Sequence, residues 1–125
     1  MDKARLQTAR HRLIALHKAI IDAERVDLER VEGRLTGGAM LQRLVSDSRF
    51  AWLRALSEVI VRFDELLEAE TLDDAEGCIT TALRLLTPGE GVADAFHTEY
   101  ARLLQDSPDV VMAHAAATGA LRTGT

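Results

Sequence analysis

At 125 residues the chain suits a single domain, with one core that buries roughly two thirds of the surface exposed by the unfolded chain. Apolar residues make up 47% of the sequence and charged residues 28%, a globular rather than a disordered composition. The formal net charge of −5 argues against nonspecific nucleic-acid binding, which depends on Lys and Arg neutralising phosphates. No apolar run reaches the roughly 18 residues of a membrane span, and the chain starts with charged residues, so we expect a cytoplasmic protein.

The first predicted element is a long amphipathic helix from Lys3 to about Leu35. Apolar residues recur along it at steps of three and four: Leu6, Leu13, Leu16, Ile20, Ala23, Val31 and Leu35. A second row, made of Ile14, Ile21 and Leu28, widens the apolar arc to about half the circumference. One neighbouring helix cannot cover that arc. Either several helices of the same chain flank this helix, or it pairs with a second copy, and we expect a homodimer through this helix.

A turn at Thr36-Gly37-Gly38 separates this helix from a short helix over residues 39–45. Residues 46–48 can cap the next helix, in which five apolar residues form a seam: Leu53, Leu56, Ile60, Phe63 and Leu67. Trp52, Val59 and Leu66 form a second row beside that seam. On the opposite face, Arg54, Glu58 and Arg62 are spaced for ion pairs four residues apart and are expected to be exposed.

Three shorter helices are predicted after this one. Thr71 can cap a helix that runs to Leu86 and is terminated by the Pro88–Gly91 segment. A fifth helix uses Val92, Phe96, Tyr100 and Leu103 as its apolar stripe, and Ser107-Pro108 starts a sixth that runs toward Leu121. We therefore predict an all-α fold: a single-domain bundle of five or six helices over residues 1–125, with the first and third helices long and central.

Polar residues within the apolar arc of the first helix are the candidates for a binding site. His17 and Glu24 stand seven residues apart there, and Arg10 lies one heptad earlier on nearly the same side. They either line a small-ligand or proton-transfer pocket between helices, or are satisfied by partners within the chain. His114 also falls among apolar residues, and we expect a backbone carbonyl to satisfy it unless it joins such a pocket.

Other sequence features argue against metal and catalytic sites. The Asp94/His97 pair stands alone and is expected to face outward, so no metal site and no cofactor are predicted. A single cysteine, Cys78, excludes an internal disulfide and falls on an apolar helix face, where we expect it to be buried. No serine occurs in a nucleophile motif, and neither glycine pair belongs to a phosphate-binding loop. No catalytic residue is assigned.

The stretch from Ser46 to Val61, SDSRFAWLRALSEVIV, resembles a segment of small bacterial helical proteins of unknown function. Their usual pattern is close to D-P-x-F-A-W-L-R-P-L-S-x-L-I-V, and this chain has Ser48 and Ala55 where prolines are typical. The similarity also touches residues 16–19, 23–25, 87–88 and 106–111. The resemblance implies a bacterial cytoplasmic origin and brings no functional residue.

These observations favour a non-enzymatic interaction or self-associating protein. The alternative is a helical bundle that binds a small ligand in an internal pocket near His17 and Glu24, together with His114. An enzyme would need an acid–base pair at substrate distance in that pocket.

Overall fold

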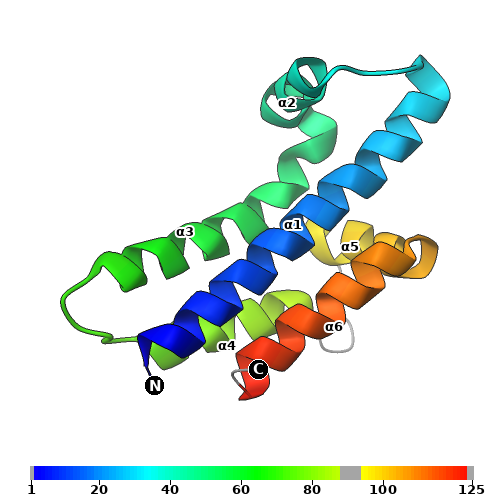
Figure 1. The fold of residues 1–125 in the computed structure, drawn as a ribbon. Helices are drawn as coiled ribbons and strands as arrows, with labels where there is room; N and C mark the ends of the chain where they lie inside the picture. Colours follow the sequence, from blue (N-terminus) through cyan, green and yellow to red (C-terminus); the bar gives the residue numbers. More distant parts are fainter. Residues whose placement is uncertain (1, 88–93, 124–125) are drawn as a thin grey trace.

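The protein is described by a computed structural model that covers residues 2–87 and 94–123 (Figure 1). In those ranges the chain forms helices and no strands. The helices are α1 (Lys3–Glu32), α2 (Gly37–Ser46), the 3-10 helix η1 (Ser48–Leu53), α3 (Arg54–Glu68), α4 (Ala75–Leu86), α5 (Ala95–Asp106) and α6 (Pro108–Thr123). The predicted all-α fold, with a long first helix, is confirmed.

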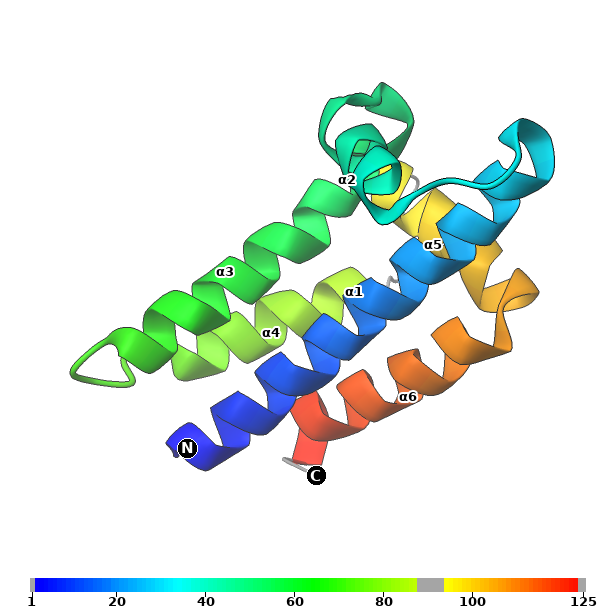
Figure 2. The ribbon, with the colours of Figure 1, turned by 45° about the horizontal axis from the view of Figure 1, so that its top comes forward.

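Four helices form the body of the molecule. α1 packs against α3 and α6, and α4 packs against the same two helices from the other side (Figure 2). α1 shares its most extensive contact with α6, which the sequence did not single out. The start of α1 and the end of α6 lie at the same end of the bundle, where the Arg5 guanidinium donates to the carbonyl of Leu121 at 3.1 Å.

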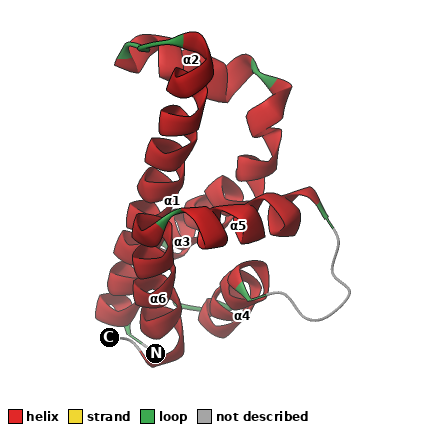
Figure 3. Ribbon diagram, turned by 90° about the vertical axis from the view of Figure 1, so that its right-hand side faces the viewer, coloured by secondary structure: helices red, strands yellow, loops and turns green. Residues whose placement is uncertain are grey.

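The segments that connect these four helices contain further helices: α2 and η1 between α1 and α3, and α5 between α4 and α6. α5 crosses the direction of the long helices (Figure 3) and contacts η1, with the rings of Trp52 and Phe96 5.6 Å apart. α2 sits on η1 and on the far half of α1, over a small second core of Leu28, Met40 and Phe50. The main core fills the space among the other helices.

The ends of α1 follow from its sequence. Asp2 caps the N-terminus by accepting the N–H of Arg5 at 2.9 Å. Gly33 ends the helix with a φ of 83°, in the left-handed region that glycine adopts without strain. Leu6, Leu13, Leu16 and Ile20 of the predicted stripe are buried, and Ala23 is partly buried. Val31 is 85% exposed, and the helix ends at Glu32, before the predicted end near Leu35.

The third predicted helix differs from the expectation in two ways. Its start is the 3-10 helix η1, capped by the Asp47 carboxylate, which accepts the N–H of Arg49 at 2.9 Å. In α3 itself, Val59 is buried whereas Ile60 is only partly buried. α3 packs against both α1 and α4, so both predicted rows contribute to the core, with Ile60 and Leu67 of the seam only partly buried.

Two local predictions in this region are wrong. Thr71 does not cap α4: its hydroxyl donates to Asp73 at 2.9 Å, and the helix begins at Ala75 after Asp74 takes a left-handed φ of 64°. Arg62 does not pair with Glu58, four residues away, because Asp74 comes within 3.1 Å of its guanidinium.

α6 begins where the sequence predicts, whereas α5 begins slightly later than predicted. Ser107 accepts the N–H of Val110 at 3.3 Å, and Pro108 occupies the first turn of α6. α5 starts at Ala95, capped by Asp94. The predicted helix stop at residues 88–91 and the predicted role of Val92 lie outside the described residues.

Candidate functional site

The polar row on α1 is satisfied by partners within the chain. The Nε2 atom of His17 lies 3.1 Å from the Ser57 hydroxyl of α3. Burial lowers the pKa of His17, which favours the neutral imidazole. Arg10, one heptad earlier, forms an ion pair with Asp64 of α3. Two of the three residues in the row therefore join α1 to α3.

Glu24 points to a different neighbour. Its side chain is only 8% exposed and accepts a hydrogen bond from the Arg102 guanidinium of α5. Arg102 also contacts Glu99 at 3.1 Å and Asp27 at 3.4 Å, so one guanidinium serves three carboxylates. Burial raises the pKa of Glu24, and the hydrogen bond from Arg102 lowers it, so the two effects oppose each other.

His114 lies apart from both of these residues. Its Nδ1 atom is 2.6 Å from the Tyr100 hydroxyl, so a side chain of α5, not the backbone carbonyl we expected, satisfies it. Burial lowers the pKa of His114 and raises that of Tyr100. Among the three candidate residues, only His17 lines one of the three grooves that follow.

The first groove, here the α2 groove, lies between α1, α2, η1 and the start of α3, with a volume of about 670 Å³. Its walls are mostly apolar: Ile21, Leu41, Leu44, Val45, Phe50, Ala51 and Leu53. His17 and Ser57 lie on the α1–α3 side, and Arg54, which has no ion pair with a described residue, is at the wall. Leu41 and Val45 remain 62% and 80% exposed. The sequence predicted a short helix here, over residues 39–45, but gave no sign of this surface.

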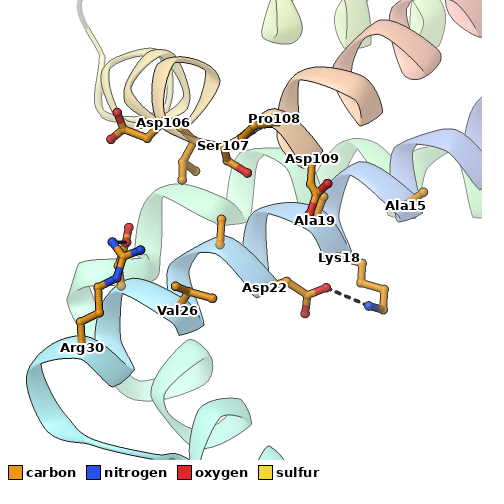
Figure 4. A pocket seen from close by; sticks show the side chains of 13 residues that line it. Ala15, Lys18, Ala19, Asp22, Val26, Arg30, Asp106, Ser107, Pro108 and Asp109 are labelled. Carbon is orange, nitrogen blue, oxygen red and sulfur yellow. Dashed lines mark hydrogen bonds and ion pairs between the residues drawn. The ribbon is translucent and has the colours of Figure 1, made fainter.

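The second groove, the corner groove, lies between α1 and the junction of α5 with α6, with a volume of about 700 Å³ (Figure 4). Ala15, Ala19 and Ala23 give it small side chains along α1. Carboxylates come from both sides, and Lys18 pairs with Asp22 at 2.8 Å. The groove thus combines a small-residue wall with a mainly acidic rim.

The third groove, the His97 groove, lies between α3, α4 and the start of α5, with a volume of about 430 Å³. The expectation that the Asp94/His97 pair faces outward is wrong for His97, whose side chain is only 11% exposed. Asp94 is the N-cap of α5, and its two carboxylate oxygens bind the backbone N–H of His97 at 2.8 Å and its Nδ1 at 2.7 Å. This cap turns the imidazole back against the bundle. An Asp three residues before a His at a helix start is the signal that could have predicted it.

Further chemical features follow from the described residues. Within residues 2–87 and 94–123, no group of three or more His, Cys, Asp and Glu side chains has a metal-binding arrangement. Cys78 is buried as predicted, and burial raises the pKa of its thiol. None of the helices described has the length and apolar character needed to cross a membrane.

Comparison with known proteins adds no relative: no family model, no curated protein and no solved structure matches the chain.

Proposed function

We propose that this chain is a non-enzymatic interaction protein of the bacterial cytoplasm that self-associates, in the simplest case as a twofold dimer, through the α2 groove and the adjoining edge of α1. The observation that carries the proposal is the exposed apolar ridge of α2. Leu41 and Val45, one turn apart, are 62% and 80% exposed beside an apolar groove. Contiguous apolar surface of this kind marks protein contacts in soluble proteins.

The low number of charged residues in α2 supports burial of this ridge in an interface. Its ten residues contain one charged side chain, Arg43, whereas charged residues make up 28% of the chain. Arg43 is held by Glu32 at 2.6 Å and by Asp47 at 3.0 Å, so its charge is compensated within the chain. Depletion of charge at the centre is what distinguishes an interface from ordinary surface.

The edge of α1 continues the apolar surface. α1 and α3 run antiparallel, and His17 lies opposite Ser57. About one turn farther from α2 on each helix, Ile14 of α1 and Val61 of α3 are 38% and 50% exposed. Ile21, on the same side of α1, is partly buried and lines the α2 groove.

Most of the wide apolar arc of α1 is covered within the chain. α3 and α6 flank the helix, and Leu13, Leu16, Ile20 and Leu28 are buried. The proposed dimer therefore uses the edge of the arc, at Ile14 and Ile21, together with α2. A ridge beside a groove is self-complementary under a twofold axis, since each copy can place its ridge in the groove of the other.

Sedimentation equilibrium at tens of micromolar tests the proposal. We expect the mass of two chains, and the mass of one chain for Leu41→Glu with an unchanged helical circular dichroism spectrum. Met112→Glu is the matched control, because Met112 is a 72% exposed apolar side chain on α6, away from α2, and it should remain dimeric. A wild-type mass of one chain, or loss of the dimer in both variants, would overturn the proposal.

A second candidate function is small-ligand binding near His17. It is favoured by the neutral His17–Ser57 pair and the unpaired Arg54 at the wall of the α2 groove. This ligand site does not include Glu24 or His114, because Glu24 contacts Arg102 and His114 contacts Tyr100. Native mass spectrometry of the purified protein separates the two functions, since a retained ligand adds a discrete mass to one chain and a dimer doubles it.

A further inference from the structure

His97 is the most unusual polar group among the described residues, because it is fixed and buried with one ring nitrogen unused. Asp94 binds both its backbone N–H and its Nδ1, so the ring cannot turn without breaking two contacts. The Nε2 atom is buried and has no hydrogen-bond partner among the described residues. Buried polar atoms are almost always paired, so this nitrogen calls for a partner outside the described residues.

The surroundings of His97 form a groove of ligand size. The His97 groove, of about 430 Å³, falls in the range typical of small-molecule sites. Ala55, Val59 and Leu85 give it apolar walls. The polar side chains at the groove are Glu58, Arg62, Thr81, Arg84 and His97. An apolar body with few convergent polar groups is the usual composition of a binding site.

The charges at the groove favour an anionic ligand. Arg62 is partly compensated by Asp74, at 3.1 Å, whereas Arg84 has no ion pair with a described residue. Glu58 is the one carboxylate among the described residues that line the groove. Two guanidiniums therefore outweigh one carboxylate at the groove itself. The planar guanidinium fork matches a carboxylate or phosphate group, to which it can donate two hydrogen bonds.

We propose that the His97 groove binds a small organic anion, with Arg84, assisted by Arg62, holding the anionic group beside the wall to which the His97 ring contributes. The apolar part of the ligand rests on Val59 and Leu85. Asp94 is a positioning residue, because it orients the His97 ring from the exposed side of α5 without lining the groove. The proposal does not rest on self-association, since the groove is on the α3–α4 side and α2 contributes nothing to it.

Three probes with the same apolar ring distinguish the anionic groups. ¹⁵N-labelled protein is titrated with benzoate, phenyl phosphate and benzamide at constant ionic strength, and the backbone amides and the His97 ring nitrogens are followed by NMR. We expect saturable shifts around the groove and at the His97 ring with at least one of the two anions. The uncharged benzamide should bind about tenfold more weakly or worse. The preferred anion identifies the ligand as a carboxylate or a phosphate.

Substitutions then assign the roles. Arg84→Gln should weaken anion binding about tenfold, while Arg54→Gln, which removes another unpaired arginine from the α2 groove, should leave it unchanged. Leu41→Glu, which tests self-association, should also bind the probe normally. Arg84 is exposed, so its substitution leaves the fold intact. Absence of saturable shifts up to tens of millimolar, equal binding of benzamide, or equal loss in the two arginine variants would overturn the proposal.

Discussion

Replacing Arg102 with methionine should destabilise the protein, because it leaves the Glu24 carboxylate buried without its cation. Removing one partner of a fully buried ion pair costs about 3–5 kcal/mol. Here the Glu24 side chain is 8% exposed but the Arg102 side chain is 40% exposed, so solvent already screens part of the interaction. We therefore expect a loss of about 2 kcal/mol in the free energy of unfolding at pH 7.

The loss should depend on pH in a defined direction. Burial already raises the pKa of Glu24 above its ordinary 4.5, and removing Arg102 takes away the group that opposes this shift. An acid whose pKa is higher in the folded state binds more protons there, so the folded state gains stability as pH falls. The difference between wild type and Arg102→Met should be largest at neutral pH, shrink as Glu24 protonates, and be nearly gone below pH 4.5.

Urea denaturation at a series of pH values from 4 to 8 measures this difference. Glu24→Gln in the same background should recover most of the loss, because the buried side chain no longer carries a charge. Arg12→Met is the control for removing an exposed arginine, with an expected change within about 0.5 kcal/mol. A loss below about 0.5 kcal/mol for Arg102→Met, or a loss independent of pH, would refute the assignment of Glu24 as a buried carboxylate held by Arg102.

Three further substitutions test the packing of α3, the backbone of α6 and the contact between α5 and α6. Leu56→Ala should lower the free energy of unfolding by about 2–5 kcal/mol, because Leu56 is fully buried in α3; a loss below about 0.5 kcal/mol in urea denaturation would remove α3 from the core. Gly119→Ala should raise it by about 0.5–1 kcal/mol, because Gly119 lies within α6 and an added Cβ meets no atom within 4 Å; a lower melting temperature would contradict that open space. Tyr100→Phe should cost about 1–3 kcal/mol, because it leaves the Nδ1 of His114 without its partner at 2.6 Å; a change that persists equally in a His114→Phe background would show that the hydrogen bond is not its cause.

The identity of the helices was predictable because their signals are local. The spacing of Leu6, Leu13 and Leu16 makes one side of α1 apolar whatever packs on it, and Gly33 permits the turn that ends the helix. The Ser107-Pro108 start of α6 is equally local. The start of α4 was not predictable from its caps, because Asp74 adopts a left-handed conformation that few non-glycine residues take.

The candidate site was predicted less well, since periodicity identifies a side of a helix and not the partner that meets it. His17, Glu24 and His114 were correctly singled out as polar groups on apolar faces. Whether they share a pocket depended on how α3 and α5 approach α1, and these helices reach His17 and Glu24 separately.

By itself, the sequence determined that the chain is all-helical, which segments form its helices, and which faces are apolar, because hydrogen bonding and side-chain periodicity act within a few residues along the chain. The tertiary structure alone decided which side chains are left without partners. Two features arise from where α2 and α5 pack on the bundle: the exposed ridge at Leu41 and Val45, and the His97 nitrogen that no described residue contacts. Those positions depend on contacts between residues far apart in the sequence, which no local pattern specifies.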